Sequence, residues 1–278
     1  MENLSKYYLK TAGLLFLVIF SACAGHQNLY KKEFSATEKK TYAKLLEQGA
    51  GLFYQGTEAC QMNLYEAREL DPTNGDVYQE IGAPLLKRGI ISQSIQAYTA
   101  AVKADSLSWL GWRGYMYLYF YRDYENAIHD FDALDELTPG IVDYPQSESV
   151  DFQRGIAYLM LKDWLMADSF FTKHLRYETG SVGVDYIESR AFLYRGITFY
   201  FQEKWDAALK DFDQGLKNLP GNANLLLWKA KTLQKLQGEN DLSQKTVQAA
   251  KESFANGNHF QRPYVEEFFQ IYEDDFNW

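Results

Sequence analysis

Apolar residues recur along most of the chain at the spacing of one helix face, and the stretch 192–216 shows this most clearly. A short polar turn at 202–204 divides that stretch into two periodic halves. The pattern predicts two helices joined by a tight turn. Pro220 is expected to end the second helix, because proline cannot continue the hydrogen-bond ladder. The apolar positions are Phe192, Leu193, Gly196, Phe199 and Tyr200, then Trp205, Ala208, Leu209, Phe212 and Leu216.

The same pattern repeats along the sequence. Three Arg-Gly pairs, at residues 113, 154 and 195, follow one another at intervals of 41 residues. Each is followed by an aromatic-rich stretch, then a small residue, then a phenylalanine four positions later, as in Ala208 and Phe212. Searching for the same spacing of small and aromatic residues towards both ends of the chain predicts six two-helix units. They begin near Thr41, Gly75, Trp109, Ser149, Ser189 and Ala223.

The repeated residue types suggest how the two helices of one unit pack. A small residue in each helix, such as Gly196 and Ala208, lets the helices approach closely, and Phe212 fills the space towards the next unit. Two units also carry an arginine and an aspartate at matching positions. We expect these to pair within the unit and to serve structure rather than binding; they are Arg113 with Asp130 and Arg195 with Asp211.

Two features interrupt the period. Successive small positions of the second helices lie 34, 33, 40, 41 and 35 residues apart, which places extra residues at 140–148 and 180–188. Both insertions contain a Val-Asp-Tyr word, and a Glu-Ser pair follows it. Insertions on one edge of a repeat array often bind, so Asp143, Tyr144, Asp185 and Tyr186 are candidate partner-binding residues. A longer first helix with a neutral loop explains the lengths equally well. Units one, three and six also need one extra residue between their small positions.

This arrangement resembles the tetratricopeptide repeat over residues 41–256. The family pattern has a small residue in the first helix, an alanine opening the second, an aromatic four residues later and a closing proline. The resemblance implies an all-α solenoid of about six helix hairpins, which we assign to residues 41–262. Neighbouring hairpins of such an array bury each other's apolar faces, which accounts for an aromatic content of 16%.

The C-terminal residues 263–278 contain Phe268, Ile271 and Tyr272 on one helical face. A terminal helix that covers the open side of the last repeat is what a solenoid needs, so the sequence predicts a capping helix here. The alternative is an aromatic tail that inserts into the groove of a partner or of this molecule.

The N-terminus has the features of a secretory signal. Lys6 and Lys10 precede an uncharged core at 12–20, which is too short to cross a bilayer. The stretch Phe20-Ser21-Ala22-Cys23 resembles the bacterial lipobox, in which the cysteine is acylated, with palmitate among its acyl chains. We therefore predict a signal peptide at 1–22, lipidation at Cys23 and a flexible tether at 23–40. An ordinary signal peptide or an uncleaved anchor is the alternative.

The distribution of charge limits the classes of partner and the cellular locations that we expect. The net charge of −9 disfavours nucleic acid, because an acidic chain repels phosphate backbones. No aspartate follows Cys23, which in enterobacterial lipoproteins favours transport to the outer membrane. Bacteroidota-like lipoproteins carry an acidic run after the cysteine for surface display. Residues 24–28 lack one, so the periplasmic face is preferred.

Candidate chemistry is sparse. The four histidines are dispersed, with no metal-binding spacing, and no nucleotide-binding or nucleophile-elbow motif occurs. Cys60 occupies the small-residue position of the first unit, where a packing thiol is expected. The sequence therefore predicts neither an enzyme, nor a cofactor, nor a metal.

Two functions remain. The first is a membrane-tethered scaffold that holds a peptide or protein of the cell envelope; this architecture resembles adaptor lipoproteins of the NlpI and BamD types. The second is a glycan-binding lipoprotein for nutrient uptake, similar in logic to SusD-like proteins, although the chain is too short for the extra lobe of that family. Candidate binding residues on the first helices are Tyr78, Trp112, Tyr115, Tyr119, Gln153 and Tyr194.

Overall fold

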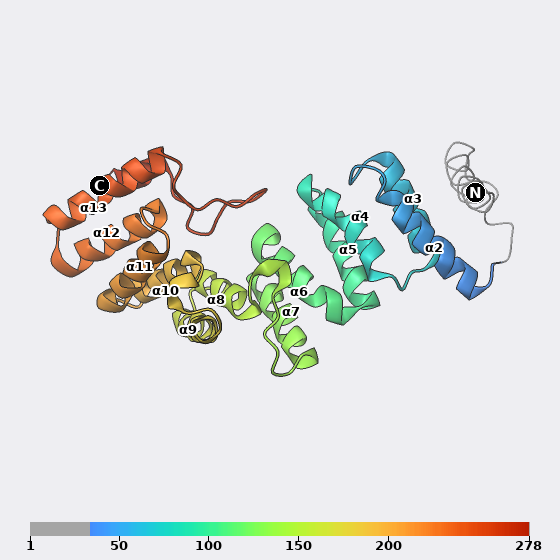
Figure 1. Ribbon diagram of the computed structural model, residues 1–278, viewed down its shortest axis with the longest axis horizontal. Helices are drawn as coiled ribbons and strands as arrows, with labels where there is room; N and C mark the ends of the chain where they lie inside the picture. The colour runs from blue at the N-terminus through green and yellow to red at the C-terminus, as the bar shows by residue number, and fades with distance from the viewer. Residues whose placement is uncertain (1–33, 278) are drawn as a thin grey trace, which may run out of the picture. The chain divides into compact units, whose positions relative to one another are not determined.

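The computed structural model describes residues 34–277, and within that range the regular structure is helical, with no strand. The chain divides into two compact units at residue 105, each a set of consecutive helix hairpins (Figure 1). This confirms the predicted all-α repeat class and the six hairpins. The signal peptide and Cys23 lie outside the described residues.

Unit 1 contains two hairpins. Their apolar core consists of small and aliphatic residues such as Ala43, Leu64 and Val77. Ser35 starts the first helix with a capping box, in which its side chain accepts a hydrogen bond from the Glu38 backbone N–H. Residues 36–40, which were predicted to belong to the tether, are therefore the first turn of this helix. The helices are α2 (Ala36–Ala50), α3 (Glu58–Leu70), α4 (Gly75–Lys87) and α5 (Ile91–Ala104).

Unit 2 contains four hairpins and the C-terminal segment. Short polar side chains set the helix starts, because Asp123, Ser149, Asp163 and Asn222 each accept a hydrogen bond from a backbone N–H of the first turn. The first helices are α6 (Ser106–Met116), α8 (Val150–Met160), α10 (Ser189–Phe201) and α12 (Ala223–Gln237). The second helices are α7 (Tyr124–Leu137), α9 (Trp164–Ser181), α11 (Trp205–Asn218) and α13 (Asp241–Ala255).

The small residues of the repeat create the expected notches. A Cβ placed on Gly196 would lie 2.4 Å from the Phe212 ring, and the same contact at Gly114 and Phe131 would be 2.5 Å. Both phenylalanines are fully buried. The glycines are therefore required by the close approach of the aromatic ring, as the repeat pattern predicted.

The two predicted internal ion pairs are present. Arg113 binds Asp130 through two hydrogen bonds of 2.7 Å, and Arg195 binds Asp211 in the same bidentate way. In the repeat that lies between these two, Phe170 occupies the position of the aspartate. Its arginine, Arg154, stacks over the Phe170 ring and bonds instead to Asp135 of the preceding hairpin at 2.8 Å.

The extra residue of the third repeat lies inside a helix. Helix α6 continues into a π-helical turn, η2 (Tyr117–Tyr121), before α7 begins. A π-helical turn holds one residue more than the same length of α-helix. The third repeat therefore absorbs its additional residue without lengthening the turn between its helices.

The two insertions lie largely in the connections between hairpins, as expected. Each forms a short 3₁₀ turn, η3 (Pro145–Ser147) in the first and η4 (Val184–Tyr186) in the second. Helix α9 runs on to Ser181, so the second insertion begins with the end of a helix rather than with loop.

The predicted C-terminal capping helix is wrong. Residues 256–272 form turns and irregular chain, and only the 3₁₀ turn η5 (Glu273–Phe276) is regular (Figure 1). Tyr264 and Phe269 adopt positive φ angles of 70° and 51°, which a right-handed helix excludes. The expected burial of Phe268 and Ile271 is observed, whereas Tyr272 is exposed. The alternative of a tail bound to this molecule is the arrangement found.

Candidate functional site

The candidate site is the surface of unit 2 that receives its own C-terminal segment, residues 260–276. The receiving residues come mainly from the first helices of the hairpins and from the first insertion. We call this surface the tail-binding face, and it comprises Tyr115, Tyr119, Arg122, Glu148, Arg190, Tyr194, Phe201 and Trp228.

Arg262 is bound by an acidic and aromatic pocket. Its Nη2 donates to Glu148 Oε1 at 2.6 Å, and its Nη1 donates to the Tyr115 hydroxyl at 3.0 Å. The guanidinium lies 3.7 Å from the centre of the Tyr119 ring. The Tyr119 hydroxyl donates to the other oxygen of Glu148 at 2.6 Å, so the carboxylate is held from two sides. Such a pocket combines ionic, hydrogen-bonding and cation–π recognition of one guanidinium.

Glu267 is the acidic counterpart in the segment. Its side chain is fully buried and accepts hydrogen bonds from Arg190 Nε at 2.9 Å and from the Tyr194 hydroxyl at 2.8 Å. Arg262 Nε also lies 3.7 Å from Glu267 Oε1. A buried carboxylate is costly unless it is paired and hydrogen-bonded, and here both conditions are met.

Phenylalanine rings of the segment complete the contact. Phe268 packs against Tyr119, with ring centres 5.4 Å apart, and beneath the Arg122 guanidinium at 4.1 Å. Phe269 packs against Trp228 of α12, with ring centres 5.6 Å apart. Phe260 packs beneath the Arg190 guanidinium at 4.6 Å, so the segment presents one cation, one anion and three aromatic rings to the tail-binding face.

Burial and charge shift the ionisation of these groups in consistent directions. Burial raises the pKa of the Tyr119 hydroxyl well above its ordinary value, and the Glu148 carboxylate adds to the rise. Burial, with Glu267, does the same to the pKa of Tyr194. For Arg262, burial alone lowers the pKa, but Tyr119, Glu148 and Glu267 outweigh it and keep the pKa above its ordinary value. Near neutral pH both hydroxyls are therefore protonated donors, and Arg262 is a cation.

The first insertion has a definite role in this site. Gln153 on α8 is fully buried, and its Nε2 donates to the carbonyl oxygens of Pro145 and Glu148, at 3.0 and 2.9 Å. These bonds fix the end of the insertion and so place the Glu148 side chain. Gln153 was predicted to contact a partner, and the structure instead gives it a positioning role.

The other predicted first-helix residues divide into two groups. Tyr115, Tyr119 and Tyr194 are brought together around Arg262 and Glu267. Trp112 packs against Trp109 of its own helix, with ring centres 5.6 Å apart. Tyr78 belongs to unit 1, where its hydroxyl donates to the Pro72 carbonyl oxygen at 3.3 Å.

The duplicated words of the insertions have different environments. Asp143 accepts a hydrogen bond from Thr138 at 2.6 Å, and the Tyr144 hydroxyl donates to Glu178 of α9 at 2.5 Å. Asp185 pairs with Lys217 of α11 at 2.7 Å, and that hydrogen bond lowers the pKa of Asp185. Tyr186 is 83% exposed. None of these four residues contacts the C-terminal segment through the interactions described above.

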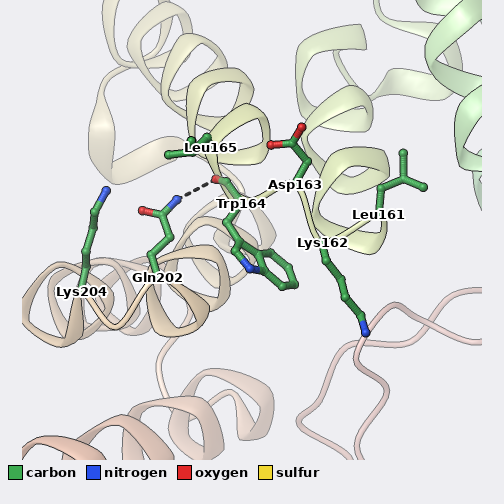
Figure 2. A pocket seen from close by; sticks show the side chains of 7 residues that line it. All are labelled: Leu161, Lys162, Asp163, Trp164, Leu165, Gln202 and Lys204. Carbon is green, nitrogen blue, oxygen red and sulfur yellow. Dashed lines mark hydrogen bonds between the residues drawn. The ribbon is translucent and has the colours of Figure 1, made fainter.

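A shallow hollow of about 590 Å³ lies elsewhere on unit 2, at the turn between α8 and α9 (Figure 2). Its residues serve the local structure. Asp163 caps α9, Trp164 stacks on Phe201 at 4.8 Å, and Gln202 Nε2 donates to the Trp164 carbonyl oxygen at 2.7 Å, the dashed bond of Figure 2. We therefore place the candidate site at the tail-binding face rather than in this hollow.

The described residues offer little for metal or membrane chemistry. No group of three or more histidine, cysteine, aspartate or glutamate side chains between 34 and 277 is arranged to hold a metal ion. Across the same range, every helix is too short or too polar to span a bilayer.

Sequence reasoning missed five charged residues of the site: Arg122, Glu148, Arg190, Arg262 and Glu267. One signal was present for Glu148, because it belongs to the Glu-Ser pair that closes the first insertion. The other four carry no periodic signal, since their contacts across the site join positions 71 or more apart.

Successive helix hairpins, notched by glycine and filled by a phenylalanine from the second helix, define a tetratricopeptide-repeat fold. Solved structures of that fold are similar to this chain. A tetratricopeptide repeat protein from Parabacteroides merdae matches with a TM-score of 0.61 and 18% identity, covering 81% of this chain and 82% of that one. PilF of Pseudomonas aeruginosa matches with a TM-score of 0.58 and 19% identity, covering 78% and 94%.

PilW, a type IV pilus biogenesis factor, matches with a TM-score of 0.59 and 13% identity, covering 77% of this chain and 94% of its own. Comparisons with protein-family models and with curated proteins find no match. At these identities the likeness establishes the fold.

Proposed function

We propose that the protein is a scaffold of the bacterial cell envelope whose tail-binding face holds a segment of another protein. The observation that supports this is the C-terminal segment itself. An irregular stretch of chain lies across the first helices of unit 2 and is recognised by side chains, as a peptide ligand is.

Two solved structures of the same fold agree with such a role. YrrB, with a TM-score of 0.51 and 16% identity, is described as a repeat protein with an unusual peptide-binding site. PilW is described as a pilus biogenesis factor, which is compatible with work at the cell envelope. Because side chains of unit 2 hold an irregular segment of chain in the way that a peptide is held, protein binding is the function that this geometry supports best.

The proposed location follows from the N-terminal sequence. Acylation of Cys23 attaches the chain to the membrane, and two or more acyl chains suffice for stable anchoring. The residues after Cys23 favour the periplasmic face of the outer membrane. In cells, a Cys23→Ala variant is expected to leave the membrane fraction, while the unaltered chain stays in it. Equal membrane retention of both chains contradicts the lipid anchor.

Site-specific photo-crosslinking in cells tests the scaffold role. A photoreactive phenylalanine analogue at position 120, beside Tyr115, is expected to form an adduct with one protein partner. The matched control carries the same analogue at Leu165, which is exposed on the second helix α9. The proposal is contradicted if position 120 forms no adduct, or if positions 120 and 165 form the same adducts.

A further inference from the structure

The C-terminal segment occupies the surface that the proposed function assigns to a partner, and the inference below rests on that function. The segment is the last part of the chain in the described range, and the six hairpins are complete without it. It can therefore leave the tail-binding face without breaking the connection between any two helices.

The segment is held by side chains rather than by a backbone ladder. The Phe260 backbone N–H donates to the Asn224 side chain at 3.0 Å. The carbonyl oxygens of Gln261 and Glu266 accept from Arg190 and Arg122. Because these bonds replace no helix hydrogen bond, releasing the segment breaks none of the hydrogen bonds within the helices of unit 2. Release also exposes Ile271 and Phe276, which are buried in the core of the last hairpin against Leu227 and Ala250.

The bound form of the segment is also strained. Tyr264 and Phe269 have φ angles of 70° and 51°, in the left-handed region that aromatic residues avoid. Gly257, with φ of 76°, forms the bend directly after α13. A separate peptide that makes the same side-chain contacts without positive φ angles avoids this strain. It can therefore compete with the segment for the tail-binding face.

Removal of the segment uncovers three kinds of site on one face. Glu148 with the Tyr115 and Tyr119 hydroxyls is a guanidinium site. Arg190 with the Tyr194 hydroxyl is a carboxylate site. Phe201 and Trp228 form an aromatic site. Each is complementary to one residue type, and their order matches Arg262, Glu267 and Phe269 of the segment.

We propose that residues 260–276 are a displaceable internal ligand of the tail-binding face. The external partner is a peptide that presents an arginine, a glutamate five positions later and two aromatic residues directly after that glutamate. The segment blocks the face until such a peptide displaces it.

The internal ligand lowers the apparent affinity for the external peptide by a calculable factor. A short tether gives an effective concentration of about 1 mM. If the same sequence binds as a free peptide with a Kd of about 10 µM, the face is closed about 99% of the time. The closed chain then binds the external peptide about 100-fold more weakly than an open one.

The test uses the full chain in detergent micelles and a fluorescent synthetic peptide with the sequence of residues 258–276. The Arg262→Glu chain is expected to release its segment, because the new carboxylate meets Glu148 and the buried Glu267. This chain should bind the peptide about 100-fold more tightly than the unaltered chain does. The charge-matched control is Lys251→Glu on the exposed face of α13, which should behave as the unaltered chain.

A second peptide carries the same Arg262→Glu change and should bind neither chain. Equal affinity of the native peptide for both chains overturns the proposal. Dimerisation of the Arg262→Glu chain without peptide binding also overturns it, since the segment then serves a second copy. Binding of the peptide without any photo-crosslinked adduct in cells leaves the internal ligand standing and removes the scaffold role.

If the Arg262→Glu chain fails to fold, hydrogen exchange of the unaltered chain tests whether the segment opens. The backbone amides of Phe268 and Gln270, which donate hydrogen bonds within the bound segment, are expected to exchange at least 100-fold faster than those of α10 and α12, because the segment opens by itself. Excess native peptide should leave the α10 amides protected while the segment exchanges faster still. Equal protection of the segment and the two helices overturns the proposal and makes the segment a permanent part of the fold.

Discussion

Arg262 Nη2 lies 2.6 Å from Glu148 Oε1, although 114 positions separate the two residues along the chain. One residue comes from the irregular C-terminus and the other from the end of an insertion between hairpins. Their pairing gives the first insertion a function in the fold, because Glu148 closes that insertion and Gln153 holds it in place.

Replacing Glu148 by glutamine is expected to destabilise unit 2 by about 1–3 kcal/mol, because Arg262 then loses the carboxylate to which it donates a charged hydrogen bond. All six tryptophans lie beyond residue 105, so tryptophan fluorescence during urea unfolding reports on unit 2. Glu136→Gln, on an exposed position of α7, is the matched control and should change the free energy of unfolding by less than about 0.5 kcal/mol. Similar values for the two variants contradict the importance of the pair.

Adding a methyl group at Gly196 is expected to cost about 1–3 kcal/mol, because the new Cβ would lie 2.4 Å from the Phe212 ring. Gly180→Ala on α9 is the control. Its Cβ meets nothing within 4 Å, so the change should be neutral or stabilise by up to about 1 kcal/mol. Urea unfolding followed by tryptophan fluorescence measures both. The notch model fails if Gly196→Ala is as stable as the unaltered chain.

Breaking the pair of Arg195 and Asp211 from one side should cost more than removing both residues. Asp211 is largely buried, and burial raises its pKa, so an Arg195→Leu chain leaves an uncompensated carboxyl group. We expect a loss of about 3 kcal/mol for Arg195→Leu. The double variant with Asp211→Leu should regain part of that loss, as measured in a double-mutant cycle by urea unfolding. Strictly additive effects contradict a buried, coupled pair.

His174 is expected to make unit 2 less stable in mild acid. Burial lowers the pKa of His174 below its ordinary 6.5, although Glu178 and Asp151 oppose the shift. The unfolded chain therefore binds the proton first, so stability is complete above pH 6.5 and falls as the pH drops below it. A His174→Gln chain should lose less stability between pH 7 and pH 5.5 than the unaltered chain. Parallel unfolding curves across that interval contradict the prediction.

The sequence was sufficient to predict the hairpins, because the packing rule is local and repeats. The contact between Gly196 and Phe212 could be predicted because the same spacing recurs in neighbouring units. The arginine–aspartate pairs occur at matching positions of their units. The unit boundaries were therefore predicted to within a few residues. The start of α2 differs because the capping box at Ser35 extends the first helix beyond the repeat pattern.

The candidate site was only partly predictable, because its contacts are made once and at long range. The helical spacing of Phe268, Ile271 and Tyr272 indicated a helix, yet the bonds available to Arg262 and Glu267 require an irregular backbone. The spacing of apolar residues indicates which side chains are buried, but it does not identify the residues that cover them. The tyrosines of the tail-binding face were identified because they lie on first helices; their charged companions follow no repeat.

The π-helical turn at Tyr117–Tyr121 has a consequence for repeat arrays of this kind. A residue added inside a helix rotates every later side chain of that helix by about 100°. Tyr119 reaches Glu148 and Phe268 from within this turn. A lineage can thus change the chemistry that one repeat displays by a single-codon insertion, while the number of hairpins and their stacking order stay as they were.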